Sequence, residues 1–208
     1  MTIETWLTYV LTTTLILMIP GPTIILVVSR AVAHGRRSVT PLAAGVVLGD
    51  FTAMTFSLLG LGAVMATSAT LFALFKWIGA LYLVYLGIRQ LRTEPQESLS
   101  DGDLKTTSAR ALFRSAYVVT ALNPKGIAFF VAFLPQFIRP VAPALPQVLL
   151  LGGTFLILAL LNAVLYALFA SQLRETIKQP RVRKWFNRGG GTALIGAGLL
   201  TAGLKRSA

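Results

Sequence analysis

The stretch LAAGVVLGDFTAMTF, residues 42–56, places one acidic residue, Asp50, inside an otherwise apolar run. No other charged residue lies between Arg37 and Lys76. The run is long enough to cross a bilayer as a helix, and an ionised Asp near the centre of such a helix costs about 2.5–3.5 kcal/mol on insertion scales. A carboxylate kept at that cost typically lines a pathway, pairs with a partner or carries a proton, so Asp50 is the first candidate functional residue.

The composition of the whole chain indicates an integral membrane protein. Of its 208 residues, 55% are hydrophobic and only 12% are charged, whereas soluble domains contain about 25% charged residues. The mean hydropathy is +0.72. Charges are absent from several segments of about 20 residues, the length that a helix needs to cross the hydrocarbon core of a bilayer.

The residue inventory excludes several kinds of site. The chain has no cysteine and one histidine, His34, so a disulfide, a thiolate site or a histidine-cluster metal site cannot form within it, and we expect no metal and no cofactor. The net charge of +12 is compatible with nucleic-acid binding. We expect no nucleic acid, because basic loop residues orient a membrane protein in the bilayer. No clear signal-peptide pattern precedes the first apolar segment, which we therefore expect to be retained.

Apolar segments predict about six transmembrane helices, at about 6–29, 41–66, 70–91, 112–138, 147–171 and 190–204. The last segment is the weakest, since it is short and rich in glycine. The first, third and fifth loops between these segments hold 14 of the 19 basic residues, while the second loop holds none and the fourth holds only Arg139. Because positively charged loops remain cytoplasmic, this pattern predicts a multi-pass protein with both termini outside.

A polar linker, residues 93–110, divides the membrane domain into a first half, 1–92, and a second half, 111–208. Three segments per half give the halves opposite orientations, and two related halves would be inverted repeats, which are common in secondary transporters. Each half begins with a segment broken by proline. The fold prediction is an all-α integral membrane protein with about six transmembrane helices, arranged as two inverted three-helix halves with broken first helices.

The first break is Pro20-Gly21-Pro22. Proline removes a backbone donor and clashes with the preceding turn, so two prolines around a glycine predict a broken helix. Inside a bilayer, such backbone is tolerated where protein or a water-filled cavity satisfies it. Pro22 suits the first turn of a new helix, whose free N–H groups could receive a carboxylate. The alternative is a structural kink.

The second break is Asn123-Pro124-Lys125-Gly126. Asn123 could cap the following helix, bind a ligand, or do both. Lys125 precedes the apolar residues 127–134 and is expected at membrane depth. There it could attract a carboxylate or pair with Asp50; the alternative is that it extends to the membrane interface.

Two polar residues have structural alternatives as well. Gly45 and Gly49 form a small-xxx-small pair that lets helices pack closely, so Asp50 could bond to a neighbouring backbone or to Lys125. Asn162, the polar residue in the second segment of the second half, could bind a ligand or could only form a hydrogen bond between helices.

At these residues the chain resembles the lysine exporter superfamily, most closely its homoserine/threonine exporter (RhtB-type) branch. The matching residues are Pro20-Gly21-Pro22, Ser29-Arg30, Gly35-Arg36-Arg37 and 45–50, followed by 122–126, Phe129-Phe130 and 133–137. Chain length and linker position match too. The resemblance implies export of amino acids or close derivatives across the bacterial inner membrane, coupled to the proton gradient. The family often has Asn where this chain has Thr23, a change that could tune the pocket.

We therefore predict a secondary exporter of small amino acids that works by proton antiport, and not an enzyme. The alternatives are an intramembrane enzyme, for which the inventory of catalytic groups is thin, and a passive helical channel. The expected partners are the amino acid, protons and the lipid bilayer, and glycine-rich faces could serve inner packing or a homodimer. Asp50 is expected to carry the proton, and carbonyls freed near Ile19 and Leu122 are expected to meet the substrate's ammonium. The predicted substrate-binding residues are Pro20, Gly21, Pro22, Thr23, Asn123, Pro124, Lys125 and Asn162.

Overall fold

The computed structural model is helical wherever it contains regular secondary structure. It describes residues 1–67, 108–139 and 141–172, together with scattered positions between 74 and 92 and between 188 and 199. The predicted third and sixth membrane segments and nearly all of the linker lie outside the continuous described ranges. The division into two three-helix halves therefore stays a prediction.

The first predicted membrane segment is two helices, α1 (Ile3–Met18) and α2 (Pro22–His34). Between them, Ile19 and Gly21 have extended backbone conformations, and Pro22 is the first residue of α2. The predicted break at Pro20-Gly21-Pro22 is thus confirmed, and it separates two helices. Gly35 ends α2 with a φ of 66°, a left-handed conformation that glycine adopts without steric cost.

The chain then passes through a short 3₁₀ turn, η1 (Gly35–Ser38), into the long helix α3 (Val39–Thr67). After the linker, α5 (Ala109–Ala121) leads to the second break, at Leu122 and Asn123. The next part consists of α6 (Pro124–Ala128), a π-helical turn η3 (Phe129–Phe133) and a 3₁₀ turn η4 (Leu134–Phe137). The long helix α7 (Ala144–Gln172) follows.

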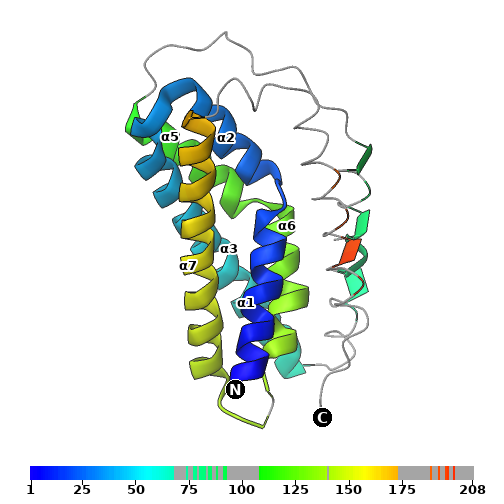
Figure 1. Ribbon diagram of the computed structural model, residues 1–208. Helices are drawn as coiled ribbons and strands as arrows, with labels where there is room; N and C mark the ends of the chain where they lie inside the picture. Colours follow the sequence, from blue (N-terminus) through cyan, green and yellow to red (C-terminus); the bar gives the residue numbers. More distant parts are fainter. Residues whose placement is uncertain are drawn as a thin grey trace.

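Several of these stretches are long and apolar enough to cross a membrane. Within the described residues, Pro22–Gly60 and Ala144–Gln172 each qualify, and Ala109–Ala121 with Pro124–Phe137 forms a third candidate that is bent by 41°. The shorter α1 is also apolar. In Figure 1, α1 and α2 lead from the end that carries the N-terminus to the opposite end, and α5 with α6 leads back. The two broken helices therefore run in opposite directions, as inverted halves would require.

Helices α3 and α5 pack through the predicted glycine pair. A Cβ atom added at Gly49 would lie 2.7 Å from the Thr120 Cβ and 2.8 Å from the Tyr117 carbonyl oxygen. Gly45 meets α5 one turn earlier, at Phe113 and Ala116. The close packing expected of this small-xxx-small pair is confirmed, and it fixes the position of the neighbouring Asp50.

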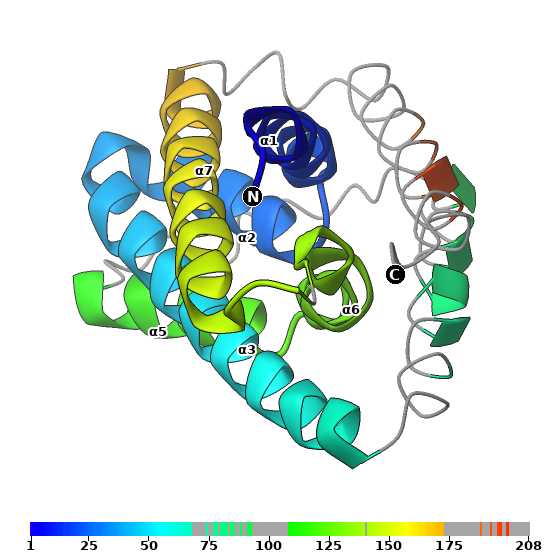
Figure 2. The ribbon, with the colours of Figure 1, turned by 90° about the horizontal axis from the view of Figure 1, so that it is seen from below.

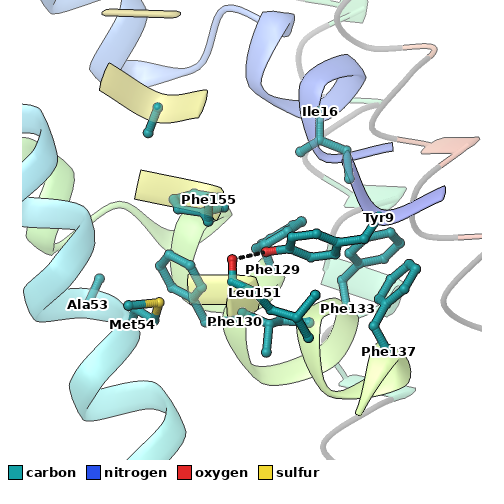
Figure 3. Packing of buried hydrophobic residues seen from close by; sticks show 12 residues of the cluster. Tyr9, Ile16, Ala53, Met54, Phe129, Phe130, Phe133, Phe137, Leu151 and Phe155 are labelled. Atoms are coloured by element: carbon teal, nitrogen blue, oxygen red, sulfur yellow. Dashed lines mark hydrogen bonds between the residues drawn. The ribbon is translucent and has the colours of Figure 1, made fainter. Parts of the chain in front are cut away.

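Two apolar clusters lie at different depths along α3 and α7. The first cluster combines residues of α1, α3, α7 and the π-helical and 3₁₀ turns that follow α6. Its members include Tyr9, Met54, Phe129, Phe130, Phe133, Phe137, Leu151 and Phe155. Figure 3 shows the Tyr9 ring among these phenylalanines, with its hydroxyl donating to the Leu151 carbonyl at 3.1 Å. The other cluster joins α2, α3, α5 and α7. Along the chain, Asp50 and Asn162 fall between the residues of the two clusters.

Seen from below in Figure 2, α1 lies beside α6 and α7, and α3 crosses the bundle at an angle. The ends of α1 and α5 and the starts of α2 and α6 meet in the interior. The last carbonyls and first N–H groups of a helix have few partners within that helix. Here the Ile19 and Asn123 N–H groups donate to the Ile16 and Thr120 carbonyls. This arrangement places the polar N–H and C=O groups of the helix ends between the two apolar clusters.

Candidate functional site

A cavity of about 40 Å³ lies at the level of the two helix breaks. Six of the nine predicted site residues line it: Gly21, Thr23, Asp50, Asn123, Lys125 and Asn162. The prolines Pro20, Pro22 and Pro124 do not line it, so their contribution is to shape the backbone around it. Much of the remaining wall is apolar, from Ile24, Val46, Phe129, Phe155 and Ala159.

Asp50 is 7% exposed and faces this cavity from α3. Neither of its carboxyl oxygens has a hydrogen-bond or ion-pair partner in the part of the chain that the structure describes. The alternatives in which Asp50 bonds to a neighbouring backbone or forms a close pair with Lys125 are therefore not what this conformation contains. A Cβ atom added at Gly126 would lie 3.9 Å from one of these oxygens, so this glycine leaves space beside the carboxyl group.

Lys125 is buried inside the helical bundle, where its side chain is only 9% exposed. Its ammonium group donates to the carbonyl oxygens of Ile16 at 3.0 Å and Ile19 at 2.8 Å, both at the end of α1. Its side chain passes over Gly21, where an added Cβ atom would lie 3.4 Å from the lysine Cδ. A cation at the C-terminus of a helix is stabilised by the negative end of the helix dipole.

Two side chains of α7 bind the remaining carbonyls at this end of α1. The Asn162 amide donates to the Leu17 carbonyl at 3.1 Å, and the Tyr166 hydroxyl donates to the Met18 carbonyl at 2.7 Å. Asn162 thus forms the interhelical hydrogen bond that was one of its two predicted roles, and it lines the cavity as well. Tyr166 was not predicted. Its spacing of four residues from Asn162 places both on one face of α7, which is the signal that could have identified it.

The N-terminal ends of the two restarted helices differ. The Asn123 side chain accepts a hydrogen bond from the Lys125 backbone N–H at 3.1 Å and so caps α6. Helix α2 has Gly21 at its N-cap position and no side-chain cap. Its first amide groups, next to the cavity, are therefore available to an anion.

Thr23 connects the two breaks. Its hydroxyl oxygen accepts from the Asn123 amide at 2.9 Å and from the Thr120 hydroxyl at 3.3 Å. Asn123 therefore caps one helix while it binds the start of the other. Thr23, the position at which the family that the chain resembles often has Asn, therefore makes polar contacts with α5 and with the cap of α6.

Leu122 does not take the role expected for its carbonyl. The residue is 70% exposed and does not line the cavity. The Ile19 carbonyl does face the interior, but Lys125 binds it in this conformation. The site therefore combines an unpartnered carboxyl group, an occupied cation position on α1 and an uncapped helix start on α2.

The cavity is too small for an amino acid. Since a water molecule needs about 10–15 Å³ by this measure, a cavity of about 40 Å³ accommodates roughly three water molecules. An amino acid is larger than that, so the cavity must widen to receive one, and we call this narrow form the closed state.

Comparisons with known proteins agree with these features. The family model described as "LysE type translocator" matches residues 14–203. The homoserine/homoserine lactone efflux protein of Salmonella typhi is 35% identical over 208 residues, which cover both chains completely. An uncharacterized membrane protein of Vibrio cholerae is 34% identical over 205 residues, or 99% of this chain and 100% of the relative.

A leucine efflux protein of Klebsiella pneumoniae is 32% identical over 133 residues, or 64% of this chain and 63% of the relative. No solved structure matches the chain. The named functions of these relatives concern the efflux of amino acids or a derivative of one. Because the family model matches nearly the whole sequence, the chain belongs to the LysE type translocator family of integral membrane proteins, as its motifs predicted.

Proposed function

We propose that this protein is a multi-pass exporter of the bacterial inner membrane that moves small neutral amino acids, or close derivatives, outward in exchange for protons. The observation that carries the proposal is Asp50, a buried carboxyl group that has no hydrogen bond or close ion pair among the described residues, in a small cavity between two broken helices that it shares with Lys125. The relatives named for homoserine, homoserine lactone and leucine efflux support the substrate class.

Asp50 is the proposed proton carrier. An ionised carboxylate in an apolar, closed cavity is costly unless it is paired, whereas a protonated one is not. Asp50 would therefore take up a proton from the outside, cross the closed state in the protonated form, and release the proton inside. The absence of a permanent partner leaves the group free to change its protonation in each cycle.

The substrate is proposed to bind between the two breaks. The uncapped start of α2 would receive the carboxylate, with Lys125 as its counter-charge, and Thr23, Asn123 and Asn162 would supply polar contacts. The site has one carboxyl group and one ammonium group, and the rest of the wall is largely apolar. These features favour small neutral amino acids over dibasic ones.

Because the cavity is closed, export requires a conformational change. Rocking of two inverted halves around a central site is the usual solution in secondary transporters. Here the two broken helices run in opposite directions and meet at the cavity, which supports this mechanism. The residues that join the breaks, Thr23 and Asn123, would lie at the centre of the motion.

The test uses purified protein in proteoliposomes with an imposed pH gradient, screened against labelled small neutral amino acids. We expect the wild type to accumulate at least one of them against its concentration gradient. Asp50→Asn keeps the shape of the side chain but cannot release a proton, so we expect gradient-driven accumulation to fall at least tenfold. The control is Glu4→Gln, an exposed carboxylate in the first turn of α1, which should transport like the wild type.

Three results would contradict the proposal. Accumulation by Asp50→Asn that equals the wild type would remove the proton role from this residue. Equilibration without accumulation in the wild type would indicate a channel. A chemically altered product recovered from the liposomes would indicate an enzyme.

A further inference from the structure

We propose that the C-terminal end of α1 is the binding site for the substrate's α-ammonium group, and that Lys125 occupies this site in the closed, empty protein. The inference rests on the proposed export of amino acids and names the group by which α1 recognises them. It gives Lys125 two alternating positions, on α1 in the empty protein and on the substrate's carboxylate in the loaded one.

The end of α1 is built as a cation site. Two carbonyl oxygens, from Ile16 and Ile19, lie 3.0 and 2.8 Å from the Lys125 Nζ atom. Both belong to the last turn and cap of a helix, where the helix dipole is negative. The Ile16 carbonyl also accepts from the Ile19 N–H at 3.2 Å, and a carbonyl oxygen has a second lone pair for an ammonium group. The site is buried, and Ile16 lines the cavity. Any primary ammonium group carries the same three donors as Lys125, so the α-ammonium of an amino acid fits the same pair of carbonyls.

The rest of the α1 end does not depend on Lys125. The Leu17 and Met18 carbonyls accept from Asn162 and Tyr166, which lie on α7. If the ammonium of Lys125 leaves, these two hydrogen bonds remain and keep the helix end in place. The Ile16 and Ile19 carbonyls are then the pair that becomes available inside the cavity.

Lys125 lies on an irregular part of the chain and near other acceptor groups. It lies on a helix of only five residues, between the Asn123-Pro124 break and a π-helical turn. Departures from regular α-helix of this kind often mark functional sites. Asp50 lines the same cavity without a partner, and the carboxylate of an incoming amino acid would be a second acceptor for the freed ammonium group.

The exchange keeps every charge paired. An amino acid enters with one ammonium and one carboxylate group. Its ammonium replaces that of Lys125 on α1, and its carboxylate receives the ammonium that was displaced. A buried charge without a partner is strongly unfavourable. This replacement lets a zwitterionic amino acid bind while each of its charged groups, and the ammonium group of Lys125, has a polar partner. It also accounts for a closed cavity in the empty protein, since Lys125 fills the substrate's place.

The experiment measures the vacated site directly with full-length purified protein. Lys125→Ala removes three methylene groups and the ammonium group, which together correspond to propylammonium. We expect radiolabelled propylammonium to bind Lys125→Ala at least tenfold more tightly than the wild type, and to raise the melting temperature of the variant by several degrees. Tetramethylammonium, which has no N–H donors, and 1-propanol, which has no charge, are the matched controls and should have neither effect.

The second measurement connects this site to the substrate. We expect the amino acid that the wild type exports to displace propylammonium from Lys125→Ala, because both would need the same two carbonyls. Equal affinity of propylammonium for the variant and the wild type, stabilisation by 1-propanol as strong as that by propylammonium, or failure of the exported amino acid to displace the label would each overturn the inference.

Two further arms keep the test decisive. If Lys125→Ala does not fold, Lys125→Met takes its place; methionine ends one atom short of Nζ, so the ammonium ion becomes the probe and sodium its control. Selective stabilisation by ammonium supports the site, and equal effects of the two ions overturn it. Efflux by the wild type is measured separately, and a wild type that transports no amino acid refutes the proposed function. The binding of propylammonium or ammonium to the Lys125 variants tests the cation site independently of that result.

Discussion

The end of α1 shows how a helix can terminate inside a membrane protein. Each carbonyl from Ile16 to Ile19 accepts a hydrogen bond from a side chain of the second half of the chain. Lipid offers no donors, so a helix end at this depth needs such partners. The contacts therefore join α1 to α6 and α7 at the same place where they form the site.

These contacts lead to a prediction at the residue scale. Asn162→Ala and Tyr166→Phe each remove one donor to α1. Interhelical hydrogen bonds in membrane proteins contribute about 0.6 kcal/mol on average and up to about 1.7 kcal/mol, so the double variant should lose about 1–3 kcal/mol. Thermal or denaturant unfolding of the purified protein checks this. The control is Tyr85→Phe, an exposed tyrosine that has no hydrogen bond to the residues that the structure describes; a double variant as stable as that control would contradict the prediction.

The sequence predicted part of this residue-scale pattern. Asp50, Lys125 and Asn123 stand out because a charge or an amide in an apolar run is rare, and all three line the cavity. Tyr166 does not stand out, since tyrosine is ordinary in membrane helices. The partners of Lys125 were also beyond sequence reasoning, because they are backbone carbonyls, which every residue carries.

At the scale of elements, the glycine face of α3 makes a second prediction. Gly49→Ala would place a Cβ atom within 2.7 Å of the Thr120 Cβ and 2.8 Å of the Tyr117 carbonyl oxygen, so α3 and α5 must separate. Overpacking of this kind costs about 1–3 kcal/mol. We expect a lower melting temperature together with reduced transport, because Asp50 is the next residue and would shift with the helix.

The matched control lies on the same helix. Gly60 has nothing within 4 Å of an added Cβ atom. Gly60→Ala should therefore be neutral or slightly stabilising, since alanine is favoured over glycine in a helix by about 1 kcal/mol. Equal melting temperatures for the two variants would show that the glycine pair is not a packing surface.

Element boundaries could be predicted where they depend on local chemistry. Both breaks follow from proline and from the Asn123 cap, and the described helices begin and end within a few residues of the predicted segments. The break in the second span was predicted, whereas its angle of 41° and the π-helical turn Phe129–Phe133 were not. Phe129 packs against Tyr9 and Phe155, which come from other parts of the chain, and a local sequence pattern contains no information about such contacts.

At the scale of the whole molecule, the two apolar clusters enclose the cavity from either side. Helices α3 and α7 extend through both clusters. An exporter must open one side while the other stays closed, and rigid packing of each cluster would make the layer between them the place of motion. The polar contacts of Thr23 and Asn123 lie in this layer.

Cysteine accessibility makes this motion measurable, because the native chain contains no cysteine and gives no background labelling. Ala159 lines the cavity and is 2% exposed, whereas Ala163, one turn further along α7, is 1% exposed and belongs to the second cluster. We expect Ala159→Cys to react slowly with a charged thiol reagent in the empty protein, because a cavity of about 40 Å³ cannot admit the reagent.

Addition of the exported amino acid under a pH gradient should raise the labelling rate of Ala159→Cys at least tenfold, because turnover opens the layer between the clusters. Ala163→Cys should stay unreactive under both conditions, since each cluster moves as a packed unit. Both variants are assayed in proteoliposomes, with the reagent added from one side at a time. Equal labelling of Ala159→Cys with and without substrate would mean that the cavity is not on the transport path, and labelling of Ala163→Cys would mean that the clusters themselves come apart.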